Sequence, residues 1–505
     1  MKSNLLNATR SFAALAAVAL LITSAQAEVK PNGLFGDGAV LQQKARVPVW
    51  GTARDGEKVT VKFQGQEVST VAKAGHWRIE LKPLKAGGPF TFSIMGDHLI
   101  TFTNVLVGEV WLCSGQSNMS FPLSRATNAS AAIAAANDSQ LRIFSVPHEA
   151  TDEPKTDVTG DWKTSTPTAV SNFSAVAYFF GRDLRHALKV PVGLIDASVG
   201  GTPAQAWTPI AALKSDPDLK DILTRYAESV RTYDPARADA EYESEVQKYP
   251  EVARNAKSVG KQPPSEPKKQ ANPARKNNRP AGLYNAMIAP LEPYALAGVI
   301  WYQGEANAGR AAEYQKLFPA LIHSWRRAWA QGEFPFLFVQ IAPYHEMTPE
   351  IREAQLLSWQ RVPNTAMVVT TDVGEALNIH PTQKEPVGTR LALAARAVAY
   401  GEQLEYSGPV FAAITIHDHQ AELNFTHLGG GLVARGGELK GFTIAGADGI
   451  FAPATAVIIK NQVIVSAPAV AKPVAVRYGW AKTPEVNLFN QEGLPATPFR
   501  TDTNR

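Results

Sequence analysis

The stretch Gly108–Asn118, GEVWLCSGQSN, ends an apolar run in a glycine and places Ser117 two residues beyond that glycine. Glu109–Cys113 is short and rich in strand-forming side chains, which predicts a central strand buried on both faces. Gly115 permits a tight turn with positive φ, and Asn118 is suited to cap a following helix. A serine at the carboxyl end of a parallel strand can present its Oγ and its N–H to one cleft. The stretch therefore predicts a nucleophilic serine, with a polar turn without chemistry as the alternative.

Composition excludes several classes of protein. The chain has 505 residues, of which 45% are hydrophobic and 19% charged, so it can bury several cores. Its formal net charge is only +4 and no basic run is interleaved with aromatic residues, which argues against a nucleic-acid partner. Cys113 is the only cysteine, so no intramolecular disulfide can form. Its place in an apolar strand predicts a core thiol.

The first 27 residues have the pattern of a cleavable Sec-type signal peptide. Two basic residues precede the apolar run Phe12–Ile22, and an Ala-Gln-Ala motif follows at 25–27. We therefore expect the mature protein to begin near Glu28 and to be secreted into a bacterial periplasm or the medium. No other apolar segment is long enough to predict a membrane span.

Both ends of the mature chain have the pattern of β domains. From Val29 to about Asn104, short apolar runs broken by glycines predict an antiparallel β-sandwich. Trp77 and Phe63 could form a sugar platform there, but aromatic side chains of a small sandwich are more commonly core. A second β-patterned region begins near Leu404, and no internal repeat relates it to the first.

Between the β regions, strand and helix patterns alternate, which predicts a parallel sheet covered by helices on both faces. The expected strands are 109–113, 142–146, 192–198, 297–301, 335–341 and 366–371, and the expected helices are 129–136, 173–188, 311–330, 350–359 and one from Pro381 to about Tyr400. Residues 209–282 interrupt this pattern with helical stretches and a segment rich in lysine, arginine and proline. We interpret them as an insertion with a solvated end, and a lid or partner surface is the alternative.

Three further polar loops follow predicted strands and should lie at the same edge of the sheet as Ser117. One holds the paired glycines Gly200 and Gly201, which permit close backbone approach to a ligand. Another is the loop 303–307, QGEAN. In the last, Pro381 disfavours helix at the preceding residue, so His380 is expected on a loop.

The motifs GEVWLCSGQSNM, GLIDASVGGTPAQAW, LYNAMIAPL, VIWYQGEAN, DVGEALNIHP and GLPATPFRTD resemble sialate O-acetylesterase-type carbohydrate esterases of the SGNH hydrolase superfamily. The resemblance covers most of the chain and implies an α/β fold. In this fold, an SGNH-hydrolase (flavodoxin-like) parallel sheet is flanked by N-terminal and C-terminal β-sandwich-like domains. The expected parts are a signal peptide (1–27), an N-terminal β domain (28–106), a catalytic domain (107–404) with the insertion 209–282, and a C-terminal β domain (405–505).

The same resemblance assigns roles to residues. It implies that Ser117 is the nucleophile and that His380 takes its proton and returns it to the leaving sugar hydroxyl. The implied oxyanion donors are Gly200 or Gly201 together with Gln303 or Asn307. No metal and no cofactor are implied.

The third member of a catalytic triad is where the sequence departs from its relatives. They commonly place an aspartate three or two residues before the histidine, and Leu377 and Asn378 stand there instead. Asp372 and Glu375 are the candidates to hold the imidazole of His380. Asp372 is favoured because we expect it at the rigid end of a strand. A Ser-His dyad oriented by a backbone carbonyl is the alternative.

These patterns predict a secreted esterase that removes O-acetyl groups from a carbohydrate, either sialic acid or a plant polysaccharide such as xylan or xyloglucan. The alternative from another class is a non-catalytic carbohydrate-binding protein on a degenerate hydrolase fold, against which the presence of both serine and histidine argues. A metallohydrolase is disfavoured because no His-x-x-x-His motif occurs. His417 and His419 have the pattern of ordinary surface residues.

Overall fold

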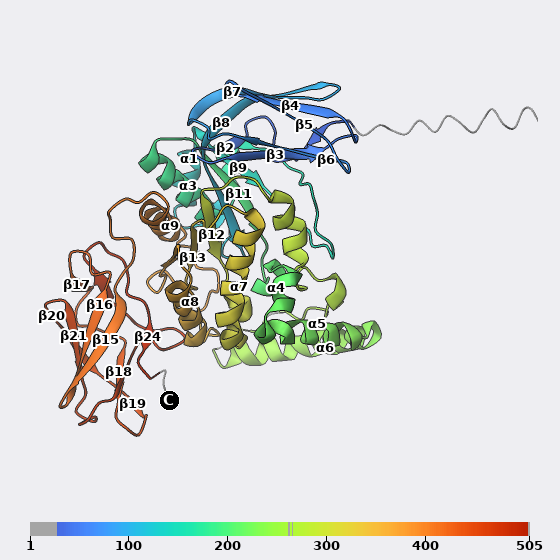
Figure 1. Ribbon diagram of the computed structural model, residues 1–505. Coiled ribbons are helices and arrows are strands. Elements are labelled where there is room, and N and C mark those ends of the chain that lie inside the picture. Colours follow the sequence, from blue (N-terminus) through green and yellow to red (C-terminus); the bar gives the residue numbers. More distant parts are fainter. Residues whose placement is uncertain (1–27, 261–262, 265, 503–505) are drawn as a thin grey trace, which may run out of the picture.

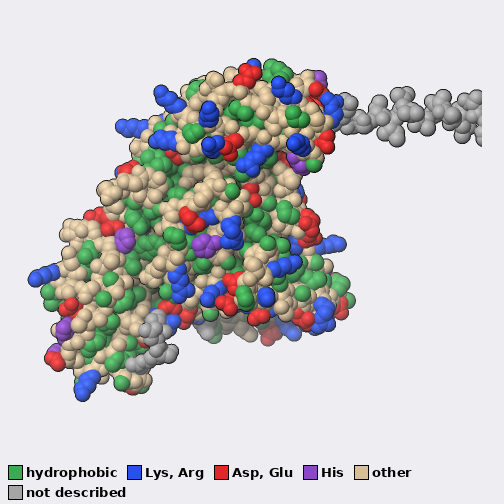
Figure 2. All heavy atoms as spheres, viewed as in Figure 1, with side chains coloured by type: hydrophobic (Ala, Val, Ile, Leu, Met, Phe, Trp, Pro, Cys, Tyr) green, Lys and Arg blue, Asp and Glu red, His purple; other side chains and the backbone are tan. Residues whose placement is uncertain are grey.

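The computed structural model describes residues 28–260, 263–264 and 266–502, and the predicted signal peptide lies outside them. The chain forms a β region, then a central α/β region, then a second β region (Figure 1). Basic and acidic side chains are interspersed over the face shown in Figure 2. None of the helices in the described ranges is long and apolar enough to cross a membrane.

The longest strand, β8 (Leu99–Gly115), belongs to two of these regions. Its first six residues are exposed or half-exposed, and its last eleven are buried. The sequence predicts a strand at 109–113 and, before it, a separate β-patterned run that ends the N-terminal sandwich near Asn104. The strand is longer because its amino half pairs with β7 (Gly87–Met95), while β2 (Val40–Gln42) pairs with residues 106–108 and covers the junction.

The central sheet has the order β10-β9-β11-β8-β12-β13-β14, and its strands are parallel except β10. The bounds are β9 (Asp138–Ser145), β10 (Lys163–Ser165), β11 (Val192–Ser198), β12 (Gly298–Tyr302), β13 (Phe336–Val339) and β14 (Thr365–Val368). The predicted α/β fold class is therefore confirmed. Because β11 and β12 are the two neighbours of β8, the loops after these three strands lie side by side.

Helices cover both faces of this sheet (Figure 1). They are α1 (Ala129–Ala134), α2 (Pro167–Ser171), α3 (Ala175–Leu188), α7 (Ala311–Trp329), α8 (Pro349–Arg361) and α9 (Glu385–Val398). On one face Trp111 meets Phe180 of α3 with ring centroids 5.1 Å apart. On the other face Trp301 meets Trp325 of α7 at 5.8 Å. Cys113 is fully buried between these faces, which confirms the predicted core thiol.

The insertion 209–282 forms α4 (Ile210–Ser215), α5 (Lys220–Arg231) and α6 (Pro235–Ser258) beside the central region (Figure 1). It is attached by Ile222, which is buried, and by an ion pair of Arg225 with Glu313 at the start of α7. Helix α6 is mostly solvated and buries only Ala238.

The N-terminal β region has a three-stranded sheet, β1-β3-β6, facing the strands that join β8. Its further strands are β1 (Lys30–Pro31), β3 (Val47–Thr52), β4 (Lys58–Phe63), β5 (Gln66–Val71) and β6 (His76–Leu81). Trp77 and Phe63 are 3% and 2% exposed. They are core side chains and form no sugar platform.

The C-terminal β region has two four-stranded sheets, β15-β16-β21-β20 and β19-β18-β22-β24, and the pair β17-β23. The bounds are β15 (Val410–His417), β16 (Gln420–Thr426), β17 (Leu432–Ala434), β18 (Phe442–Ala445), β19 (Phe451–Pro453), β20 (Thr455–Ile459), β21 (Gln462–Ser466), β22 (Ala475–Tyr478), β23 (Leu488–Asn490) and β24 (Phe499–Arg500). His417 and His419 are exposed at a hairpin, as expected of surface residues.

The apolar cores separate the C-terminal region from the rest of the chain but continue across the junction near residue 106. Leu423, Ile444 and Val476 belong to a core confined to the C-terminal region. The apolar residues of the N-terminal region share one core with the central sheet. We propose boundaries at 106/107 and 404/405, of which the first lies inside β8.

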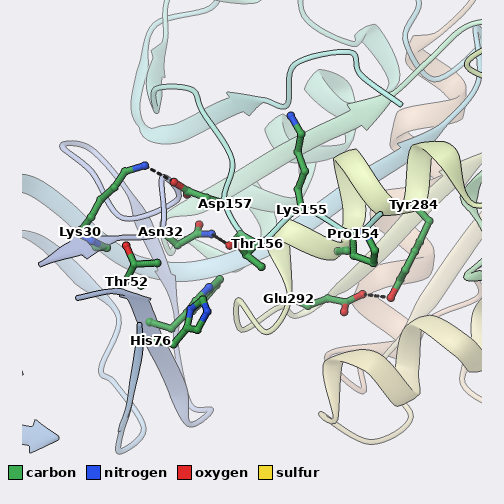
Figure 3. A pocket seen from close by; sticks show the side chains of 14 residues that line it. Lys30, Asn32, Thr52, His76, Pro154, Lys155, Thr156, Asp157, Tyr284 and Glu292 are labelled. Carbon is green, nitrogen blue, oxygen red and sulfur yellow. Dashed lines mark hydrogen bonds and ion pairs between the residues drawn. The ribbon is translucent and has the colours of Figure 1, made fainter. Parts of the chain in front are cut away.

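A cavity of about 440 Å³ lies where the N-terminal β region meets the central region (Figure 3). Thr52 and His76 line it from one side, and Tyr284 and Glu292 line it from the other. The Tyr284 hydroxyl donates a hydrogen bond of 3.0 Å to Glu292 Oε1. Burial raises the pKa of Glu292 to about 8. The residues predicted to be catalytic do not line this cavity.

This carboxyl group makes stability depend on pH. Between about pH 4.5 and pH 8 the folded protein keeps a proton on Glu292 that the unfolded chain releases, so the free energy of unfolding falls as the pH rises. Glu292→Gln keeps a neutral acceptor for Tyr284 and removes the fall in the free energy of unfolding that ionisation of Glu292 causes. We expect the variant's unfolding midpoint to exceed that of the wild type by about 2–4 °C at pH 8.5 and to match it at pH 4.5. Calorimetry at both pH values tests this, and equal shifts at both would contradict it.

Candidate active site

The turn that carries Ser117 is held against the end of β12. Gly115 has a φ of +136°, and a Cβ at this position would lie 2.2 Å from the carbonyl oxygen of Tyr302. The N–H of Gln116 donates to that oxygen at 2.9 Å. The turn therefore requires glycine, and it leaves Ser117 half-exposed between the buried side chains of Gln116 and Asn118.

The glycine loop after β11 packs against the same turn. A Cβ on Gly200 would lie 3.4 Å from the Cβ of Ser117, whereas one on Gly201 would meet nothing within 4 Å. The N–H of Val199 donates to the carbonyl oxygen of Gly115 at 3.1 Å. Of the two predicted glycines, the structure brings Gly200 to the serine.

The loop after β12 is joined to the glycine loop by side-chain amides. Gln303 Nε2 donates to Asn307 Oδ1 at 2.8 Å and to Thr202 O at 3.3 Å. Asn307 Oδ1 also accepts from the N–H of Ala204 at 2.9 Å, and its Nδ2 donates to Gln205 Oε1 at 3.0 Å. The two predicted amide donors thus contact each other and fix the loop 202–205.

These contacts distinguish the two amides. Each Gln or Asn amide has two N–H groups. Gln303 is fully buried and uses its Nε2 for two acceptors of the protein. Asn307 is 5% exposed, and Gln205 is the single acceptor of its Nδ2 among the described residues. Asn307 can therefore still donate to a bound molecule.

The histidine loop lies beside the serine turn. Asn118 Nδ2 donates to the carbonyl oxygen of Ile379 at 2.9 Å, which joins the residue after Ser117 to the residue before His380. Burial lowers the pKa of His380, and the positive charges of Lys384 and Arg125 lower it further. The imidazole is therefore neutral, and able to accept a proton, at a lower pH than an exposed histidine.

Glu375 shapes this loop through hydrogen bonds to the loop itself. Its Oε1 accepts from the N–H of Thr382 at 2.7 Å, and its Oε2 accepts from Asn378 Nδ2 at 2.9 Å. Asn378 Oδ1 in turn accepts from the N–H of His380 at 3.0 Å. These bonds explain why α9 begins at Glu385 and not near Pro381, as the sequence predicts, because the preceding residues close the loop.

Asp372 lies in a different environment from the one expected. Its two oxygens accept from Arg390 at 2.8 and 2.5 Å, and Arg390 also donates to Val369 O. Strand β14 ends at Val368, so Asp372 lies in a loop and turns toward α9. Among the described residues no hydrogen bond joins Asp372 to His380, so the preference for Asp372 that the sequence suggested finds no support in this geometry.

Sequence reasoning missed two buried charged residues behind the serine. Lys384 and Glu305 both bond to Asn118, which the sequence suggested only as a helix cap. Glu305 stands inside the polar loop after β12, and Lys384 follows His380 by four residues. Their closeness in sequence to the loop 303–307 and to His380 was the signal that could have identified them.

The four loops together present a hydroxyl, an imidazole and several N–H donors at one edge of the sheet. A serine hydroxyl is suited to attack a carbonyl carbon when a neutral imidazole lies within hydrogen-bond distance to take its proton. Backbone and amide N–H groups around it are suited to stabilise the oxyanion that forms. This set of groups supports acyl transfer.

The glycine turn can be tested for its role in the fold. We expect Gly56→Ala, which has a φ of +82° and open space around it, to lower the free energy of unfolding by about 1–2 kcal/mol. Gly115→Ala adds a clash with the Tyr302 carbonyl and should cost about 1–3 kcal/mol more. Chemical denaturation of both variants measures the difference. Equal losses would mean that the turn tolerates a side chain.

The family model and the curated relatives that match this chain agree on one family. A family model described as carbohydrate esterase, sialic acid-specific acetylesterase, matches residues 272–397. The sialate O-acetylesterase of Rattus norvegicus is 36% identical over 428 residues, which cover 75% of each chain. That of Homo sapiens is 32% identical over 438 residues, covering 77% of this chain and 75% of the human one.

A solved structure agrees with this result. The crystal structure of a carbohydrate acetylesterase from Xanthomonas citri superposes with a TM-score of 0.79 at 39% identity, covering 94% of this chain and 99% of the other. Identity above 30% over three quarters of the mammalian enzymes exceeds what a shared fold alone would give. The chain therefore belongs to the sialate O-acetylesterase family of carboxylic ester hydrolases.

Proposed function

We propose that this protein removes O-acetyl groups from a carbohydrate, with Ser117 as nucleophile and His380 as general base. The observation that carries the proposal is the hydrogen bond from Asn118 to Ile379, which joins the two segments that hold these residues. Gly200 packs against Ser117 on its other side. A non-catalytic binding protein would not need a serine and an imidazole on adjoining loops.

In this mechanism Ser117 Oγ attacks the acetyl carbonyl carbon while His380 takes the hydroxyl proton. The tetrahedral oxyanion is stabilised by backbone N–H groups of Ser117 and Gly200 and by Asn307 Nδ2. Collapse breaks the bond to the sugar oxygen, which leaves with the proton from His380. Water activated by the same imidazole then hydrolyses the acetyl-serine and releases acetate.

We propose Asn307 as the side-chain oxyanion donor and Gln303 as its support. Asn307 Oδ1 accepts two hydrogen bonds from the protein, which fixes the plane of the amide. A donor fixed in advance needs no reorganisation when the oxyanion forms. Gln303, whose Nε2 donates within the protein, holds that plane from behind.

We propose that His380 acts in a dyad and is oriented by its own loop. The carboxylate of Asp372 is occupied by Arg390, and that of Glu375 by Thr382 and Asn378. In the described part of the chain, no hydrogen bond joins either carboxylate to the imidazole. Glu375 then affects His380 through the shape of the loop.

A second cavity favours an acidic sugar as the first substrate to test. It has a volume of about 300 Å³ and begins at Pro203 and Gln205, next to Asn307. Its charged lining is entirely basic and is supplied mainly by the insertion: Arg225, Lys276, Arg279 and Arg310. Arg225 and Arg279 are paired with Glu313 and Asp152, so Lys276 and Arg310 supply the positive charge for a ligand. They would attract a carboxylate, which sialic acid carries and neutral xylan or xyloglucan lacks.

We further propose secretion through the signal sequence at 1–27 into a bacterial periplasm or the medium.

Acetate release from O-acetylated sialic acid, acetyl xylan and acetylated xyloglucan, each at equal acetyl concentration, tests which substrate the enzyme prefers. Faster release from the plant polysaccharides would contradict the preference for an acidic sugar.

Replacing the nucleophile should abolish turnover. We expect Ser117→Ala to lower kcat for acetate release by about three orders of magnitude or more, because no covalent intermediate can form. The unfolding midpoint should stay near that of the wild type. Ser124→Ala, an exposed serine seven residues later, is the matched control and should keep normal turnover. Normal turnover of Ser117→Ala would refute the mechanism.

A second pair of variants tests the roles of the two carboxylates one at a time. We expect Asp372→Asn to lower the unfolding midpoint, because its charged pairing with Arg390 is lost, while kcat stays within about threefold of the wild type. Glu375→Gln should reduce kcat moderately by loosening the histidine loop. A triad aspartate would cost about 10⁴ in kcat on the same change to asparagine. A loss of that size for Asp372→Asn would refute the dyad.

A further inference from the structure

Behind Ser117 a buried row of polar side chains joins residues that the mechanism above does not use. Lys384 Nζ donates to Asn118 Oδ1 at 2.5 Å, and Asn118 Nδ2 donates to Glu305 Oε1 at 2.6 Å. Lys384 is 1% exposed, Asn118 is fully buried, and Glu305 is 8% exposed. The row thus has a cation at one end and a carboxyl group at the other, with an amide between them.

Placing a lysine here has a high free-energy cost, because a buried charge loses its hydration. Two aromatic rings offset part of that cost. Lys384 Nζ lies 4.8 Å from the ring centroid of Phe121 and 5.3 Å from that of Tyr302. Phe121 follows Ser117 by four residues, and Tyr302 accepts the hydrogen bond that fixes the serine turn. Lys384 therefore contacts the serine turn from several sides.

Asn118 is the central member of the row. Its Oδ1 accepts from Lys384, and its Nδ2 donates to Glu305 and to the carbonyl oxygen of Ile379. These three partners come from the residue that precedes α9, the loop after β12 and the histidine loop. Because each atom of the amide is engaged, the side chain has one orientation, and a change at Lys384 frees the amide to rotate.

We propose that Lys384 is a positioning residue of ester hydrolysis, which acts through Asn118 to keep the Ser117 turn and the His380 loop at their working separation. The inference rests on the proposed roles of Ser117 and His380. Lys384 itself is enclosed and does not reach the substrate.

The same placement puts a charge beside the imidazole. Lys384 and Arg125 are the cations that lower the pKa of His380, after burial, and Glu375 lies in the same loop, with Glu305 beyond Asn118. Burial lowers the pKa of Lys384 to about 7, so the amine is charged at the acid pH where His380 takes up its proton. Removing this charge should raise the pKa of His380. The acid limb of kcat/KM then moves to higher pH.

The test uses Lys384→Met, which keeps the length of the side chain and removes its donor and its charge. We expect kcat for acetate release to fall by about 10²-fold, as for small displacements of reacting groups, while KM changes by less than about threefold. The acid limb of the pH profile should move upward. Lys163→Met, at an exposed lysine of β10, is the control and should leave both quantities unchanged.

The outcomes separate this inference from the proposed function, because Ser117→Ala is assayed beside the lysine variants. If Ser117→Ala is inactive but Lys384→Met has the wild-type kcat, or a lower kcat with an unmoved acid limb, only the inference is wrong. If Ser117→Ala keeps its turnover, the proposed function is wrong. Should Lys384→Met fail to fold, Lys384→Gln keeps an N–H donor without the charge, and an unmoved acid limb in that variant refutes the inference.

Discussion

The structure depends on one strand that must be buried on both faces and must still end at an open cleft. Strand β8 satisfies the first requirement because helices α3 and α7 press Phe180 and Trp325 toward opposite faces of the sheet. It satisfies the second because Gly115 turns the chain where any side chain would meet the Tyr302 carbonyl. The neighbours of β8 then decide which loops meet at that end, and they are the loops after β11 and β12.

Hydrogen bonds of side-chain amides join these separate loops beneath the cleft. Gln116 binds the loop after β12, Asn307 binds the glycine loop, and Asn118 binds the histidine loop. Buried amides of this kind stabilise a fold only when their donors and acceptors are paired. Here most of those pairings run between loops, so the polar interior beneath the cleft sets its geometry.

The sequence predicts those features that follow from local pattern. Strand β11 begins and ends where its alternation indicates, and Cys113, Trp77 and Phe63 are buried as expected. What it does not predict are pairings between distant residues. Arg390 reaches Asp372 from a helix face, and Lys384 reaches Asn118 across 266 positions of the chain. Neither partner has a periodicity or motif that identifies the other, so only the packed sheet reveals that Asp372 is occupied and that Asn118 is a link.

The continuity of β8 has a consequence for how the molecule comes apart. No turn or loop separates its amino half, which belongs to the N-terminal sheet, from the half that ends at Gly115, and one apolar core surrounds both. The N-terminal sheet and the central sheet therefore share one core, whereas the C-terminal β region has a core of its own and is joined to α8 by the ion pair of Arg500 with Glu353. Loss of the pairing between β7 and β8 would therefore act on the same strand that ends at the serine turn.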